Sequence, residues 1–220
     1  MESKAISEGR TVGRPVGHSP ARGAILAAAE RAFAERGLAG ARTVSIASEA
    51  GVNHALVFYY FGNKESLYEA VMEDHFAGFN EQALEVLADP CPPGEVLLRY
   101  IGLHFDFVSR QQRNSQLFHQ SLCARGAMME RLVRKYFLPR NQAFVRLLQR
   151  GMKAGEFRRG DAQQTAISIV ALIVFYFSAA PVIQMIGLKG AFTEATLKRR
   201  KEEVLDFVRH GLFSDSISKP

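Results

Sequence analysis

Apolar residues recur at helical spacing along almost the whole chain, and no window alternates between apolar and polar positions as a strand would. The first periodic segment covers residues 21–36 and stops at Gly37, a residue type that commonly follows a helix end. Two short helices joined by a turn are expected between residues 42 and 61. A long helix then begins after Asn63, a good N-cap, and runs to about Ala88.

The second part of the chain predicts a larger set of helices, separated from the first by the Pro-rich break Asp89–Pro93. Helices are expected over 94–111, 115–125 and 127–153, the last kinked at Pro139. Asp161 is expected to cap an apolar helix and Thr193 a final helix. The predicted fold is therefore all-α, with an arm over 1–20, a small domain over 21–64, a larger helical bundle over 65–213 and a tail over 214–220.

The composition of the chain indicates its cellular compartment and the kind of partner that it binds. Apolar residues make up 47% and charged residues 23% of 220 residues, as in a soluble globular protein. The net charge of +6 suits a polyanion such as DNA or an anionic membrane. Cys91 and Cys123 form no disulfide framework, and residues 1–20, a flexible basic arm, lack the apolar core of a signal peptide. These features predict a cytoplasmic protein.

Residues 165–187 contain no charged residue and have about the length of a membrane span. Ser168, Ser178 and Gln184 dilute the run, and Pro181 interrupts it. A helix that is apolar on every side also suits the centre of a helical bundle. We expect a bundle helix and no membrane partner, with a membrane-associated helical protein as the alternative.

The run from Thr43 to Val57 has the residue types that a helix-turn-helix needs. Two helices that cross closely need a small residue where they touch, and Ala47 supplies it. The turn needs a positive φ, which Gly51 adopts without steric cost. Val57 is then placed to pack the second helix on the first. An ordinary corner between two helices is the alternative interpretation.

The residues that follow favour DNA as the partner. We expect the second helix to present His54, Tyr59 and Tyr60 outward, because such groups suit bases and phosphates. Asn63 and Lys64 come next, so that the amides and dipole of a helix N-terminus and an ammonium group converge on one phosphate position. The segment from Thr43 to Phe61 therefore predicts binding to double-stranded DNA.

Four stretches of the sequence together resemble the tetracycline-repressor (TetR) family: Ala24–Ala29, Phe33–Gly37, Ile46–Val52 and Tyr59–Tyr68. The resemblance covers about residues 21–70. It implies an N-terminal three-helix helix-turn-helix domain followed by a bundle for regulation and dimerisation. It further implies a homodimeric repressor that a small-molecule effector releases from a palindromic operator. An activator, or a regulator without a ligand, stays open.

The resemblance also implies which residues contact DNA. By this resemblance, residues 43 and 44 begin the supporting helix, and residues 54–56 face the bases. The tyrosines and the lysine that follow would face the groove wall and the phosphates. The expected set is Thr43, Val44, Asn53, His54, Ala55, Leu56, Tyr59, Tyr60 and Lys64. Phe58 stands where the family often has tyrosine; it lacks one hydroxyl for a phosphate and can belong to the core.

The larger bundle is expected to bind the ligand and to form the dimer. Aromatic residues at helical spacing usually belong to a core, but some are expected to line a pocket. The expected ligand-binding residues are His104, Phe105, Phe118, Phe144 and Tyr176. By the resemblance, the helices Thr165–Met185 and Thr193–Phe213 would build the dimer interface as a four-helix bundle with a second copy.

Catalytic and metal chemistry find no support in the sequence. Gly-x-Ser-x-Gly, His-Glu-x-x-His, phosphate-loop and dinucleotide motifs are absent. His119 and Cys123 share a helical face, but two ligands are too few for a zinc site. We therefore predict no enzymatic activity, no metal and no cofactor, and an all-helical enzyme is the rival class.

Overall fold

The computed structural model describes residues 19–110, 127–186 and 190–214. The regular elements in these ranges are all helical, and the extended backbone contributes one isolated bridge, between Phe157 and Phe213. The all-α prediction is confirmed. The helix expected at 115–125, which carries Phe118, His119 and Cys123, lies outside the described residues.

Three helices form the N-terminal domain: α1 (Pro20–Gly40), α2 (Thr43–Glu49) and α3 (His54–Phe61). Gly37 interrupts α1 at φ 66° and ψ 175°, so the regular helix stops where the sequence predicts, and one further turn follows. Ile25, Phe33, Ile46 and Val57 form a small core with the first half of the next helix.

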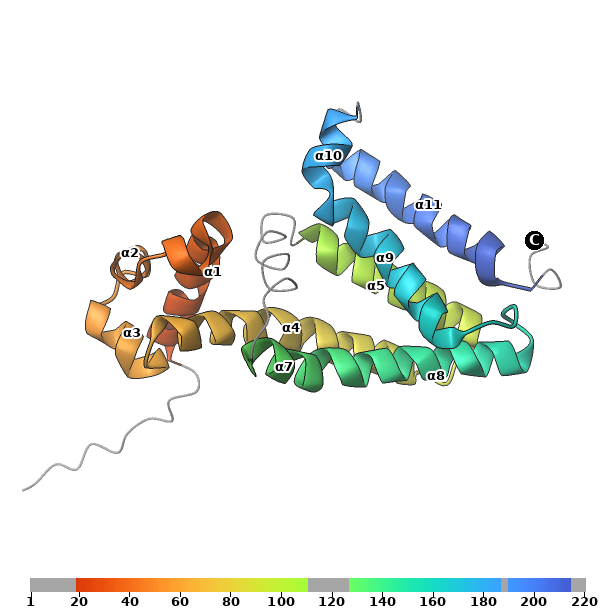
Figure 1. Ribbon diagram of the computed structural model, residues 1–220, viewed down its shortest axis with the longest axis horizontal. Helices are drawn as coiled ribbons and strands as arrows, with labels where there is room; N and C mark the ends of the chain where they lie inside the picture. The colour runs from red at the N-terminus through yellow and green to blue at the C-terminus, as the bar shows by residue number, and fades with distance from the viewer. Residues whose placement is uncertain (1–18, 111–126, 187–189, 215–220) are drawn as a thin grey trace, which may run out of the picture.

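Helix α4 (Lys64–Ala88) is continuous and connects the N-terminal domain to the C-terminal bundle (Figure 1). Asn63 caps it as expected, its side-chain oxygen accepting a hydrogen bond from the Ser66 amide at 2.7 Å. Its first half, up to Phe76, packs in the N-terminal core, and from Phe79 onward it packs in the C-terminal core. The boundary between the two cores therefore falls within α4, beyond residue 64.

The C-terminal bundle begins with α5 (Pro93–Arg110). The expected helix over 127–153 consists of α7 (Ala127–Leu132), the π-helical segment η3 (Val133–Phe137) and α8 (Leu138–Ala154). The irregularity lies just before Pro139, which occupies the first turn of α8, where its missing N–H costs least. These segments lie along α4 in Figure 1.

The outer layer of the bundle consists of α9 (Ala162–Ser178), α10 (Ala180–Met185) and α11 (Glu194–Leu212). Asp161 and Thr193 cap α9 and α11, as expected, and the apolar run is broken at Ala179, next to Pro181. Within the described ranges, no helix combines the length and the apolar character that a membrane crossing needs.

Candidate DNA-binding site

The helix-turn-helix is built by α2, α3 and the turn between them. Gly51 has φ 66°, and the Val52 amide donates to the Ala47 carbonyl at 3.0 Å. The Asn53 side chain accepts a hydrogen bond from the Ala55 amide at 2.8 Å and so caps α3. Ala47 and Val57 are buried, as their predicted packing roles require.

The outward face of this unit is more apolar than basic. On α3 it consists of Ala55, Phe58 and Tyr59, which follow one another at helical spacing, and α2 adds Val44. Phe58 is 45% exposed and Tyr59 is 69% exposed, so the alternative that Phe58 belongs to the core is wrong. Apolar groups on such a face suit van der Waals contact with thymine methyl groups.

Other expected contact residues lie at the margins of this face. The His54 imidazole Nε2 lies 2.9 Å from the Thr43 hydroxyl, which ties α3 to the start of α2. Leu56 packs partly against the N-terminal core. Tyr60 is half-buried rather than fully outward, because its hydroxyl donates to Ser19 Oγ at 2.9 Å.

Lys64 stands at the first turn of α4, beside the end of α3. Its ammonium group donates to the carbonyls of Ala39 and Ala41, at 3.4 Å each. Since an ammonium group has three donors, one is left for a phosphate. Lys64 therefore links the start of α4 to the end of α1.

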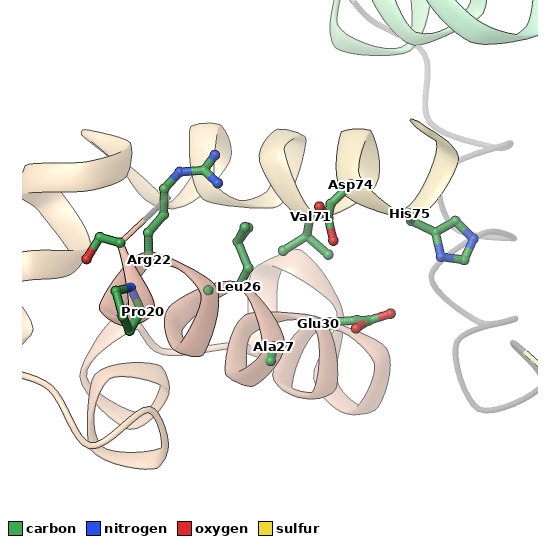
Figure 2. A pocket seen from close by; sticks show the side chains of 10 residues that line it. Pro20, Arg22, Leu26, Ala27, Glu30, Val71, Asp74 and His75 are labelled. Carbon is green, nitrogen blue, oxygen red and sulfur yellow. The ribbon is translucent and has the colours of Figure 1, made fainter. Parts of the chain in front are cut away.

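The N-terminal domain is joined to α4 along α1 (Figure 2). Leu26 of α1 and Val71 of α4 line a cavity of about 430 Å³ at this junction, together with Glu30, Asp74 and His75. Burial, and then the nearby Asp74 carboxylate, raise the pKa of Glu30. Burial lowers the pKa of His75 to about 4, so the imidazole is neutral at pH 7.

A second cavity, of about 310 Å³, lies in the C-terminal bundle. Of the five expected ligand-binding residues, Phe144 lines this cavity, and Phe118 lies outside the described residues. Phe105 packs instead against Phe177, with ring centroids 5.3 Å apart, and Tyr176 donates to the Ala191 carbonyl at 2.6 Å.

His104 is buried next to residues that line this cavity, its ring centroid 5.9 Å from that of Tyr100. The sequence did not indicate Tyr100 and Arg140, which line the cavity. One signal was available for Arg140: it stands four residues before Phe144 and eight before Leu148, on the buried face of α8.

A helix-turn-helix joined by one long helix to a helical bundle that contains a cavity defines a class of DNA-binding regulators. Residues 25–71 match the family model described as "Bacterial regulatory proteins, tetR family", and residues 93–208 match "Tetracyclin repressor-like, C-terminal domain". The chain belongs to the TetR family of transcriptional regulators, a family of regulators and not of enzymes.

Individual relatives agree with this assignment. The chain is similar to the HTH-type transcriptional repressor NicS of Pseudomonas putida, with 25% identity over 70% of this chain and 74% of the relative. It is also similar to the HTH-type transcriptional regulator TtgR of the same species, with 27% identity over 69% of this chain and 76% of the relative.

Among solved structures, the fold is similar to that of SmeT, the repressor of the Stenotrophomonas maltophilia multidrug efflux pump SmeDEF. The TM-score is 0.69 at 23% identity, and the match covers 93% of this chain and 95% of SmeT. A complex of SmeT with triclosan matches with a TM-score of 0.71 at 22% identity, over 92% of this chain and 96% of that one.

Proposed function

We propose that the protein is a homodimeric repressor that a small molecule releases from a palindromic operator. The observation that carries the proposal is the continuity of α4, which begins at the end of α3 and takes part in both hydrophobic cores. A displacement of α4 in the bundle would therefore move the helix-turn-helix.

Contacts between α4 and the segment α7–η3 support this coupling. Arg131 binds Glu69 through two hydrogen bonds, of 2.7 and 2.8 Å, and Lys135 binds Glu73 at 2.8 Å. The ring of Phe137, which lines the cavity in the bundle, lies 4.9 Å from the ring of Phe76 on α4. A ligand in that cavity would thus act on residues that touch α4 close to the N-terminal domain.

The exposed face of α2 and α3 is our choice for the surface that enters the major groove. Val44, Ala55 and Tyr59 belong to the contact set that the sequence predicts, and Phe58 joins them on geometry. We propose that Lys64 binds a backbone phosphate, and that Thr43, Asn53, His54, Leu56 and Tyr60 lie at the edges of the contact or support it.

The outer layer of the bundle is the proposed dimer interface. Large apolar side chains are exposed there; they are Ile167, Phe175, Val182, Met185, Ile186 and Phe207. A groove between α9 and α11 is lined by Ser168, Leu172, Phe207 and Gly211. Side chains of a second copy of the chain can pack into this groove. In the dimer, two recognition helices would stand about 34–36 Å apart.

Selection of bound sequences from a library of random duplex DNA tests the operator and the dimer symmetry in this proposal. The expected result is an inverted repeat whose half-sites are centred about 10–10.5 base pairs apart, or a multiple of that distance. An asymmetric consensus would contradict the symmetric dimer, and a failure to enrich any sequence would contradict an operator-specific repressor.

Replacing Lys64 with alanine is expected to weaken binding to specific and random DNA alike, because a phosphate contact carries no sequence information. The slope of log affinity against log salt should become shallower by about one for each subunit bound. The measurement is a salt titration of DNA binding by fluorescence anisotropy. Lys153→Ala, at an exposed position near the far end of α8, is the matched control. Weaker binding at an unchanged slope would instead assign the effect to the bonds with the Ala39 and Ala41 carbonyls.

A further inference from the structure

The cavity in the C-terminal bundle contains a buried cation. Arg140 lines the cavity and is only 9% exposed. Its guanidinium lies over the rings of Phe79 and Phe137, at 4.7 and 5.1 Å from their centroids, and interacts with the Tyr100 hydroxyl. One terminal nitrogen, Nη1, is buried without a hydrogen-bond partner in the described structure.

Among the described residues, Arg140 forms no ion pair with an Asp or Glu oxygen within 4.0 Å of its guanidinium nitrogens. No carboxylate of the described chain therefore neutralises its charge. The sequence of residues 111–126 contains neither Asp nor Glu. Burial lowers the pKa of Arg140, yet arginine stays protonated in proteins. His104 offers no compensation, since burial and the charge of Arg140 lower its pKa to about 3 and keep it neutral.

A buried charge without a counter-charge is costly, and such groups are normally paired. A planar guanidinium matches the two oxygens of a carboxylate, with which it forms short, charge-assisted hydrogen bonds. We propose that the effector of this regulator is a small monocarboxylate whose carboxylate group binds Arg140 and Tyr100. This inference rests on the proposed ligand-released repression and names the class of its ligand.

The remaining walls of the cavity define the rest of the ligand. They are largely apolar, from Val133, Phe137, Leu138, Phe144 and Val170, with Asn141 as a further polar group. At about 310 Å³, the cavity lies at the small end of the range for ligand pockets. The ligand therefore has a compact aromatic or short aliphatic body. A phosphate monoester, with close to two negative charges, would bring an excess charge into a site that holds one cation.

The site also has a route to the DNA-binding domain. Val133 and Phe137 belong to η3, and π-helical turns inside α-helices are frequent at functional sites. Arg140 rests on the ring of Phe79 on α4. A carboxylate that draws the guanidinium away would loosen this contact and bias the position of α4.

Isothermal titration calorimetry on the full-length protein tests the ligand class. The probes are phenylacetate, 4-phenylbutanoate and octanoate, each compared with its own primary amide, which has the same body and no charge. At least one carboxylate is expected to bind about thirtyfold or more tighter than its amide. Amides that bind as tightly as their acids, or a lack of binding by all three acids, would overturn the proposal.

Two variants locate the effect. Arg140→Met is expected to bring the ratio of carboxylate to amide affinity to about one, and to melt at the same temperature as the wild type or higher, because an uncompensated charge is removed. Tyr100→Phe changes one hydroxyl and is expected to lower the ratio about tenfold. A carboxylate preference that survives in Arg140→Met, a ratio that is unchanged in Tyr100→Phe, or a large loss of stability in Arg140→Met would contradict the assignment.

Electrophoretic mobility shifts on the selected operator separate this inference from the function on which it rests. Release of DNA by a carboxylate and not by its amide supports both. Carboxylates that bind at Arg140 without releasing DNA would contradict ligand-released repression and leave the ligand class in place. Release by the amides alone would contradict the ligand class and leave repression in place.

Discussion

Replacing Phe175 with glutamate is expected to convert the protein from a dimer into a monomer and to lower operator affinity about a hundredfold to ten-thousandfold. Phe175 is 69% exposed at the centre of the proposed interface on α9, and burying a carboxylate there would cost more than the surrounding apolar contacts return. A monomer binds one half-site and loses the gain in affinity that comes from linking two sites.

Analytical ultracentrifugation at micromolar concentration and anisotropy on the selected operator measure the two effects. Ala77→Glu adds the same charge at an exposed position on α4 and serves as the control. It is expected to stay dimeric. Phe207→Glu, on α11, should behave like Phe175→Glu. A Phe175→Glu protein that sediments as a dimer, or a wild-type protein that is already a monomer, would contradict the proposed interface.

The helix ends were the most predictable part of the fold, because they depend on local chemistry. Asn63, Asp161 and Thr193 each cap the helix that the sequence assigned to them. Gly37 and Gly51 take the positive φ that glycine adopts at little cost. Each of these signals involves only a few neighbouring residues, so a single sequence is enough to find it.

Side-chain exposure on α3 was harder to predict. This helix has eight residues, so periodicity defines its faces poorly. Tyr60 is partly covered because its hydroxyl donates a hydrogen bond to Ser19, 41 residues earlier in the chain. Phe58 is exposed because Val57 and Phe61 fill the core on the other side. The contact of Tyr60 with Ser19 is distant in sequence, so a pattern within one short helix cannot predict it.

Most of the residues that line the cavity could not be identified from the sequence, for a related reason. Aromatic residues at helical spacing cannot show which of them touch a void and which touch one another. Phe105 and Tyr176 have the same pattern as Phe144, yet they pack against Phe177 and Phe192. The more informative residue was Arg140, since a charged side chain within an apolar stripe requires a partner.

Exposed apolar side chains, taken together, mark three separate surfaces. In the described part of the chain, Val44, Phe58 and Tyr59 lie on the helix-turn-helix, and Val133 and Leu138 line the cavity. The others with large exposed areas lie on α9, α10 and α11. A monomeric protein rarely exposes such groups in clusters. The three clusters correspond to the three proposed partners: DNA, the effector and a second copy of the chain.

Lowering the pH from 7 to 5 is expected to reduce the free energy of unfolding by about 3–4 kcal/mol through two histidines. Burial lowers the pKa of His104 to about 3 and that of His75 to about 4, against an ordinary value of 6.5. In this window the unfolded chain binds protons that the folded chain does not, so stability falls as pH falls. Between pH 7 and 5, proton uptake by the unfolded chain lowers stability by about 2 kcal/mol through His104 and by somewhat less through the partly exposed His75.

Urea unfolding of the wild type, His75→Gln and His104→Gln at pH 8, 7 and 5 separates this effect from packing. Each variant loses some packing energy at every pH. It also lacks the histidine whose protonation stabilises the unfolded chain of the wild type at low pH. The difference in stability from the wild type should therefore shrink by up to about 2 kcal/mol between pH 7 and 5 and stay nearly constant between pH 8 and 7. A difference that is the same at all three pH values would mean that the histidines are protonated as readily in the folded protein as in the unfolded chain.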